Sequence, residues 1–271
     1  MVARIMTVTS GKGGVGKTTI TANIGTSLAI LGQRVCLIDA DFGLRNLDIP
    51  LGLSNRIILN LSDFMAGRCK LEQIIIKDKQ LPTLSFISCG LEDASEFNRW
   101  FFRDVVHQIA MDYDFVLIDS PAGIETGFEN AILASDEAIV VTTPHWTSIQ
   151  DADRVIGLLE DMLRPTPQLI INMAREHQEA TEFIVDTETM ANILKIGVLG
   201  TVNEDIEIIR SIQKGRPIAL NPEFESGLRF RHIARNLVGN MQKPFIEAKP
   251  KQNQKRYLSK YKRLFSWRRL R

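Results

Sequence analysis

The segment from Ser10 to Thr19 constrains the fold of this chain more than any other. It reads Ser-Gly-Lys-Gly-Gly-Val-Gly-Lys-Thr-Thr and matches the phosphate-loop pattern G-x-x-x-x-G-K-[ST]. The β-branched run Arg4 to Thr9 precedes it directly, and a helical pattern from Ile20 to Leu31 follows it. Strand, loop and helix therefore occur in the order that this motif requires, and the sequence predicts a phosphate-binding βα unit near the start of the chain.

Each residue type in this loop has a chemical role. Glycines let the backbone turn tightly and bring its N–H groups close to phosphate oxygens. Lys17 is expected on the β and γ phosphates, the Thr18 hydroxyl on Mg²⁺, and Thr19 near the α phosphate. We therefore predict ATP and Mg²⁺ as cofactors. The predicted ATP-binding residues of the loop are Gly11, Lys12, Gly13, Gly14, Val15, Gly16, Lys17, Thr18 and Thr19.

Short apolar runs, each followed by a stretch of helical character, recur along the chain. This alternation predicts a doubly wound α/β fold, with a mostly parallel sheet covered by helices on both faces. The predicted strands are Arg4 to Thr9, Arg34 to Ile38, Leu84 to Ser88, Phe115 to Ile118, Ala138 to Thr142, Leu169 to Ile171 and Ile196 to Val202. One large domain is expected over residues 1–245, followed by a polar linker over 246–254 and a separate C-terminal segment over 255–271.

Three aspartates stand at the ends of predicted strands. Asp39 and Asp41 follow the second run, and Asp119 follows Phe115-Val-Leu-Ile118 in the Walker-B pattern. Because the carboxyl ends of parallel strands form the ligand-binding edge of such a sheet, all three are expected near the phosphate loop. We predict that Asp119 holds Mg²⁺, directly or through water. Taken singly, each aspartate could equally cap a helix or a turn.

Lys12 goes beyond the general phosphate-loop pattern. The sequence Lys12-Gly-Gly-Val-Gly-Lys-Thr18 resembles the signature of the deviant Walker-A ATPases, the MinD/ParA family. The resemblance implies that Lys12 is catalytic and crosses the interface of an ATP-bound homodimer to the nucleotide of the other subunit. A cation placed on the charge that develops in phosphoryl transfer would act as an arginine finger does. The alternative is an ordinary solvated lysine in a loop.

Two later segments resemble the switch regions of the MinD branch of this family, whose members are ATPases that position the division septum. They are Asp39-Ala-Asp-Phe-Gly-Leu-Arg-Asn-Leu-Asp48 and Asp119-Ser-Pro-Ala-Gly-Ile-Glu-Thr-Gly127. The resemblance runs from Ala3 to about Pro244. It implies that Asp41 orients the attacking water, that Asp39 is a second catalytic residue near the metal, and that Gly123 senses the γ phosphate.

Arg45, Asn46 and Asp48 lie just beyond the first of these carboxylates. By resemblance they would shift with the nucleotide state, so that a regulator could recognise that state there. An ordinary surface loop is the other interpretation. The family resemblance implies partners of two kinds, a division inhibitor of the MinC type and an ATPase activator of the MinE type.

The base-binding side is indicated by resemblance alone. Asn172, after the strand that ends at Ile171, resembles the family asparagine that reads the adenine edge, and Asp205 is predicted to bind ATP beside it. Asn203 stands where the family usually has proline, and His145-Trp146 departs from the usual acidic and apolar pair. The three cysteines lack paired spacing and the histidines lack ligand spacing, which argues against a disulfide framework or a zinc site.

The net charge of +1 conceals a strong asymmetry. From Lys249 onward there are ten lysines or arginines and no acid, whereas the preceding residues contain 23 basic and 32 acidic side chains. At the 100° step of a helix, five apolar residues of this tail fall within an arc of about 120°, and Trp267 flanks it. This pattern predicts an amphipathic helix that lies in the interface of an anionic membrane. Its predicted membrane-binding residues are Tyr257, Leu258, Tyr261, Leu264 and Phe265.

The tail permits two other interpretations, nonspecific binding to nucleic acid phosphates and an inert solvated segment. The sequence argues against nucleic acid as the partner, because binding to phosphates needs charge but no apolar stripe. The leading hypothesis is therefore a MinD-like ATPase that dimerises with ATP, binds the membrane reversibly and positions the division septum. A ParA-like DNA partition ATPase is the alternative. The expected location is peripheral to a membrane, on its cytoplasmic face in a bacterium or its stromal face in a plastid.

Overall fold

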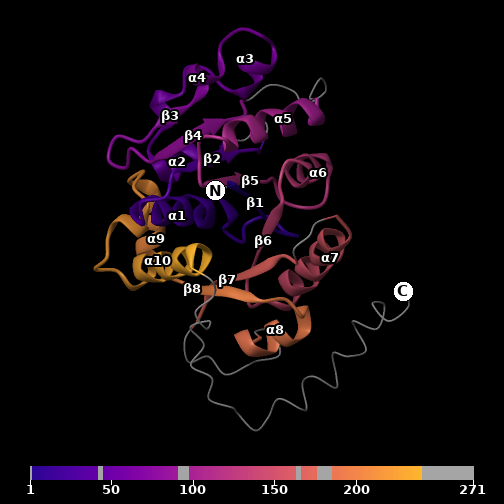
Figure 1. Cartoon of the computed structure of the whole chain (residues 1–271). Coiled ribbons are helices and arrows are strands. Elements are labelled where there is room, and N and C mark those ends of the chain that lie inside the picture. Colours follow the sequence, from indigo (N-terminus) through magenta and orange to yellow (C-terminus); the bar gives the residue numbers. More distant parts are fainter. Residues whose placement is uncertain (1, 42–44, 91–97, 163–165, 176–184, 240–271) are drawn as a thin grey trace.

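The computed structural model describes residues 2–41, 45–90, 98–162, 166–175 and 185–239. Eight strands in this part of the chain form one sheet, in the order β3-β4-β2-β5-β1-β6-β7-β8 (Figure 1). Their bounds are β1 (Arg4–Thr9), β2 (Val35–Asp39), β3 (Ile76–Lys77), β4 (Leu84–Ser88), β5 (Phe115–Asp119), β6 (Glu137–Thr142), β7 (Gln168–Ala174) and β8 (Val198–Asn203). The linker and tail predicted over 246–254 and 255–271 lie outside the described residues.

The strand pairings confirm the predicted doubly wound, mostly parallel sheet. All neighbouring strands from β4 to β8 run parallel, and the edge strand β3 is antiparallel to β4. The sequence did not predict β3, because a strand of two residues is too short to show alternation. The seven predicted strands are all present, with ends that differ by up to three residues.

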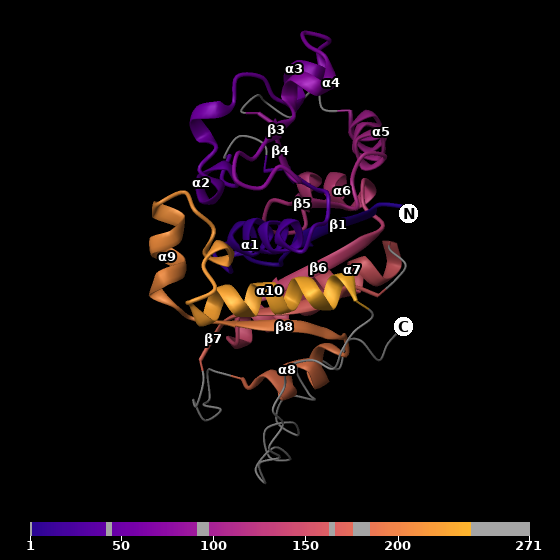
Figure 2. The ribbon, with the colours of Figure 1, turned by 60° about the vertical axis from the view of Figure 1, so that its left-hand side comes forward.

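Helices cover both faces of the sheet, as predicted. They are α1 (Lys17–Ile30), α2 (Asp48–Leu51), α3 (Leu61–Met65), α4 (Leu71–Ile74), α5 (Arg99–Ala110), α6 (Thr126–Leu133), α7 (Trp146–Met162), α8 (Thr187–Leu194), α9 (Ile206–Gln213) and α10 (Glu225–Val238). The described part of the chain also contains the short 3₁₀ turns η1 (Ser54–Arg56) and η3 (Ile218–Leu220). Helices α1 and α10 lie side by side on one face (Figure 2), and α5 to α8 pack on the other.

The alternation of side chains along each strand explains this arrangement. In β1, Met6 and Val8 belong to the apolar cluster under α1 and α10, whereas Ile5 belongs to the cluster under α5. Successive side chains of a strand point to opposite faces, so a continuous apolar run buries both faces of the sheet. Among the described residues, no helix combines the length and the apolar character needed to cross a bilayer.

Candidate functional site

The phosphate loop connects the carboxyl end of β1 to the amino end of α1. Gly14 and Gly16 have φ angles of 79° and 91°, in the left-handed region that glycine enters without strain. Gly11 packs against α7, and a Cβ atom added to it would lie 2.3 Å from the carbonyl oxygen of Asp151. The loop thus requires glycine for two reasons, backbone conformation at two positions and lack of space at a third.

Lys17 is buried at the base of this loop. Its Nζ donates a hydrogen bond to Ser10 Oγ at 3.0 Å, and that hydroxyl donates to the carbonyl of Lys12 at 2.7 Å. Burial lowers the pKa of Lys17, while the charges of Asp119 and Asp41 oppose this change. The ammonium group therefore lies close enough to both carboxylates to interact with their charge. The Lys12 residue itself is exposed.

Asp119 ends β5 and is fully buried against α1. Its Oδ1 accepts a hydrogen bond from Thr21 Oγ1 at 3.0 Å, and Thr18 also hydrogen-bonds to this carboxylate. Burial raises the pKa of Asp119 to about 7, and the negative charge of Asp39 contributes to the rise. A divalent cation would stabilise the ionised form, and the oxygen atoms of Asp119 and Thr18 are the ligand type that Mg²⁺ prefers. The residues present therefore fit Mg²⁺.

Ser10 and Thr21 were not among the predicted site residues. Thr21 follows Thr18 by three positions, which places both hydroxyls on one face of α1. This spacing is visible in the sequence and could have indicated that Thr21 supports the Walker-B carboxylate. Ser10 carries no such signal, because its bond to Lys17 depends on the three-dimensional path of the loop.

Asp39 lies directly beside Asp119 in the register of β2 and β5. It is buried, and both of its oxygens are engaged by backbone N–H groups of the following segment. Oδ1 accepts from Asp41 at 3.1 Å, and Oδ2 accepts from Asn46 and Leu47 at 3.0 Å each. Burial raises the pKa of Asp39, and these three hydrogen bonds act against the rise. In the structure Asp39 therefore organises the backbone of the first switch segment.

The remaining predicted residues of this segment lie around Asp39. Asp41 is partly buried, and its pKa is raised by burial and lowered by the charge of Lys17. Arg45 adopts a left-handed φ of 46° and approaches the buried Asp48, with 3.5 Å between Nη2 and Oδ2. Residues 42–44 between these side chains lie outside the described residues.

The second switch segment contacts the phosphate loop directly. The N–H of Gly123 donates to the carbonyl oxygen of Ser10 at 3.1 Å, and Gly123 has a left-handed φ of 92°. Nothing lies within 4 Å of a Cβ atom built on Gly123, so the backbone angle rather than space favours glycine there. A displacement of the loop would therefore be transmitted to this segment through one hydrogen bond.

The two predicted base-side residues have partners inside the protein. The Asn172 amide nitrogen donates to the carbonyl oxygen of Val15 at 2.8 Å. Asp205 begins α9 as its N-cap: Oδ1 accepts from the N–H of Glu207 at 2.8 Å and Oδ2 from Ser226 Oγ at 2.6 Å. Asn172 therefore reaches the phosphate loop, whereas Asp205 stabilises a helix terminus and links it to α10.

Among the residues that the structure describes, no group of three or more His, Cys, Asp or Glu side chains could hold a metal ion. Cys36, Cys69 and Cys89 are free thiols. Burial raises the pKa of Cys36 and Cys89 well above the ordinary value for a thiol.

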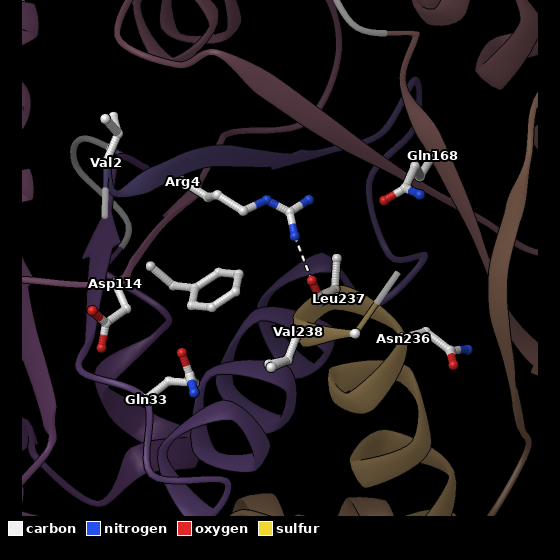
Figure 3. Close-up of a pocket in the computed structure, with 10 residues that line it drawn as sticks. Val2, Arg4, Gln33, Asp114, Gln168, Asn236, Leu237 and Val238 are labelled. Carbon is white, nitrogen blue, oxygen red and sulfur yellow. Dashed lines mark hydrogen bonds between the residues drawn. The ribbon is translucent and has the colours of Figure 1, made fainter. Parts of the chain in front are cut away.

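A cavity of about 600 Å³ lies away from the phosphate loop, at the edge where the strands begin (Figure 3). Arg4 crosses its rim, where Nη1 donates to the carbonyl of Leu237 at 2.5 Å and two other nitrogens bind Glu137. Asp114 at the same rim binds Arg34. Arg4 and Asp114 at this rim are thus paired within the protein, and the phosphate-loop edge carries the chemistry expected of a nucleotide site.

Comparisons with known proteins also indicate a nucleotide-binding site. Residues 6–218 match the model of the CobQ/CobB/MinD/ParA nucleotide binding domain. The septum site-determining protein MinD of Bacillus subtilis is 44% identical over 236 residues, which cover 86% of this chain and 88% of that protein.

Two solved structures are similar over almost their whole length. MinD in the MinC:MinD cell division protein complex of Aquifex aeolicus has a TM-score of 0.82 and 39% identity, with 91% of this chain and 100% of that chain covered. MinD of Pyrococcus horikoshii, complexed with Mg-ADP, has a TM-score of 0.78 and 29% identity, with coverage of 87% and 96%. The chain therefore belongs to the MinD/ParA family of nucleotide-binding ATPases and, within it, to the septum site-determining MinD proteins.

Proposed function

We propose that this protein is a Mg²⁺-dependent ATPase that dimerises with ATP, binds the membrane reversibly and positions the division septum. One observation carries the proposal: a buried Lys17 and the three carboxylates Asp39, Asp41 and Asp119 meet at one edge of the sheet, beside a glycine-rich loop. Membership of the MinD proteins supports the cellular role.

In this proposal the loop from Gly11 to Thr19 binds the phosphates of ATP. Its N–H groups and the positive end of α1 attract the anion, and Lys17 neutralises part of its charge. Thr18 and Asp119 would hold Mg²⁺, which would neutralise part of the negative charge on the phosphate oxygens and so favour the approach of a nucleophile. The related Mg-ADP complex of the Pyrococcus protein supports this choice of cofactors.

Hydrolysis of ATP to ADP and phosphate would then depend on two further residues. Asp41 is partly buried and close to Lys17, and it would accept a hydrogen bond from the attacking water and orient it. The exposed Lys12 would supply a positive charge to the nucleotide of the partner subunit. Asp39 would hold the segment that carries Asp41, through its three backbone hydrogen bonds.

Membrane binding is assigned to the C-terminal segment 255–271, which lies outside the described residues. One short amphipathic helix binds a membrane weakly, and a dimer joins two of them, so the second insertion is effectively intramolecular. ATP would thereby control residence on an anionic cytoplasmic or stromal membrane surface. The Aquifex complex supports a MinC-type protein as one partner, and a MinE-type activator is proposed by family resemblance.

The decisive experiment is sedimentation of the full chain with anionic liposomes, with ATP, with ADP and without nucleotide. We expect sedimentation with ATP alone and phosphate release that EDTA abolishes. The variant Leu264→Ser/Phe265→Ser keeps all ten basic charges of the tail but should lose sedimentation. The control Val2→Ser/Met111→Ser removes two exposed apolar side chains of the body and should sediment normally.

Three outcomes would contradict the proposal. Equal sedimentation of the tail variant would show that charge alone suffices. Sedimentation independent of nucleotide would separate membrane binding from the ATPase site. Retention of the wild type on DNA, with ATP and without liposome binding, would favour a partition ATPase instead.

A further inference from the structure

Thr21 lies on the buried side of α1 and faces the carboxylate that ends β5. The residue is fully buried, and its Oγ1 donates a hydrogen bond to Asp119 Oδ1 at 3.0 Å. We propose that Thr21 is a positioning residue for the metal site: it holds the Asp119 carboxylate in the orientation that binds Mg²⁺ and thereby sets the affinity of the site for that cation. The inference rests on the proposed function, in which Thr18 and Asp119 hold Mg²⁺. Thr21 itself touches neither the metal nor the nucleotide.

The place of Thr21 on α1 separates it from the metal ligands. Thr18 and Thr21 both hydrogen-bond to the Asp119 carboxylate from the same face of the helix. Three residues advance about 4.5 Å along a helix axis, so Thr21 lies that much farther from the phosphate loop than Thr18 does. Thr18 is needed as a ligand of the cation, whereas Thr21 can hold Asp119 from behind while the carboxylate binds the metal in front.

The chemistry of the groups around Thr21 fixes the direction of this hydrogen bond. The hydroxyl has one hydrogen, and a second acceptor, the carbonyl oxygen of Lys17, also lies at 3.0 Å. That carbonyl already has a partner, because in an α-helix it accepts from the backbone N–H of Thr21 itself. An ionised carboxylate is the stronger acceptor of the two. Beside a metal ion Asp119 carries its charge, and the hydroxyl hydrogen is then directed to Asp119.

Burial makes this hydrogen bond difficult to replace. Asp119 is 1% exposed and Thr21 is 0% exposed, so bulk water does not reach the contact between them. Lys17 and Asp39 also act on Asp119, but through their charge. A charge attracts or repels the carboxylate as a whole, whereas a hydrogen bond depends on angle and fixes how the group is turned. Mg²⁺ needs nearly ideal octahedral geometry, so its affinity depends on that orientation.

The test measures how strongly ADP binding depends on Mg²⁺. Thr21→Val replaces the hydroxyl by a methyl group, Thr21→Ala removes both groups, and Thr21→Ser keeps the hydroxyl. ADP binding to the full chain is measured by calorimetry over a series of Mg²⁺ concentrations and in EDTA. The Mg²⁺ concentration that gives half of the full increase in ADP affinity should rise roughly tenfold or more in the Val and Ala variants, because loss of a group that orients a metal ligand usually costs this much in metal affinity.

Two further results are expected from the same variants. In EDTA all of them should bind ADP as the wild type does, because Thr21 contacts no phosphate. Thr21→Ser should require the same Mg²⁺ concentration as the wild type. In ATP hydrolysis the apparent KM for Mg²⁺ should rise in Thr21→Val, whereas kcat at saturating Mg²⁺ should be kept. A general defect in folding would instead lower kcat at every Mg²⁺ concentration.

Thr26 provides a matched control on the same helix. It is a buried threonine of α1, and its hydroxyl has no hydrogen-bond partner within the part of the chain that the structure describes. Thr26→Val therefore makes the same exchange of hydroxyl for methyl without loss of a hydrogen bond to the site. It should leave the Mg²⁺ requirement, ADP affinity and kcat unchanged.

Three results would overturn the inference. An unchanged Mg²⁺ requirement in Thr21→Val and Thr21→Ala would show that Asp119 is oriented without Thr21. An equal rise in Thr26→Val would show a nonspecific effect of the exchange on α1. A loss of ADP affinity in EDTA as large as the loss in Mg²⁺ would show that Thr21 acts on the nucleotide rather than on the metal. Failure of the wild type to bind ADP more tightly with Mg²⁺ than with EDTA would instead refute the proposed function on which the inference rests.

Discussion

Replacement of Asp39 by alanine removes the acceptor of three backbone N–H groups of the first switch segment. The partners are Asp41, Asn46 and Leu47, at distances of 3.0 to 3.1 Å. Asp41 is partly buried and Asn46 is exposed, so water can replace the carboxylate at those two N–H groups. Leu47 is fully buried, and its N–H would be left without a partner. The cost therefore comes mainly from one buried donor.

The expected loss in the free energy of unfolding of Asp39→Ala follows from two opposing effects. Loss of a hydrogen bond to a charged group, with a buried donor left unsatisfied, costs about 2 to 3 kcal/mol. Removal of a buried negative charge beside Asp119 returns part of this, because burial raises the pKa of both carboxyl groups and the charge of Asp39 adds to the rise in the pKa of Asp119. We expect a net loss of about 2 kcal/mol, or roughly 4 to 8 °C in Tm for a domain of this size. Asp39→Asn keeps one acceptor oxygen and should lose about half as much.

Urea denaturation and the rate of ATP hydrolysis together test this account. The rate of ATP hydrolysis should fall by more than the loss of folded protein accounts for, because the segment that Asp39 holds also carries Asp41. Mg-ADP binding should be largely kept. The control is Asp78→Ala, which removes a carboxylate that accepts from Gln80 and Leu81 at 2.7 and 2.8 Å, away from the site. That variant should lose stability without loss of specific activity. Full stability and activity in Asp39→Ala would refute the reasoning.

Three further changes give direct tests of the site. Between about pH 4 and pH 7 the folded protein without Mg²⁺ retains a proton on Asp119 that the unfolded chain has released, so its stability falls as the pH rises through this window. Asp119→Asn should flatten this dependence in thermal denaturation with EDTA, and an unchanged slope would contradict the assignment. Lys12→Ala should bind ATP but barely hydrolyse it, and mixing it with Asp41→Ala subunits should restore part of the activity; full activity of Lys12→Ala alone would exclude exchange between subunits. Gly11→Ala should cost about 1 to 3 kcal/mol in urea denaturation because its Cβ would collide with the backbone of α7. Gly13→Ala has room for a Cβ atom and should keep its stability, and equal losses in the two variants would show that the contact with α7 is not the cause.

The sequence determined the features of this protein that depend on neighbouring residues. The phosphate loop could be identified because its glycines, Lys17 and Thr18 act at fixed spacing within one βα unit. The fold class followed from apolar runs that alternate with helical stretches, because runs of that kind need helices on both faces of a sheet. The aspartates at the strand ends were expected at one edge for the same reason, and Asp39 and Asp119 are indeed neighbours there.

Tertiary structure alone decided which distant groups meet and what each side chain does. Asp39 was predicted to lie near the metal, and the structure adds that its oxygens bind the backbone of its own switch segment. Asn172 was predicted to read the adenine edge, and the structure adds that its nitrogen binds Val15, 157 positions earlier in the chain. Such partners depend on strand order, register shifts and the close approach of glycines. These are properties of the packed sheet, and because residues far apart in the chain establish them together, no local segment of the sequence contains them.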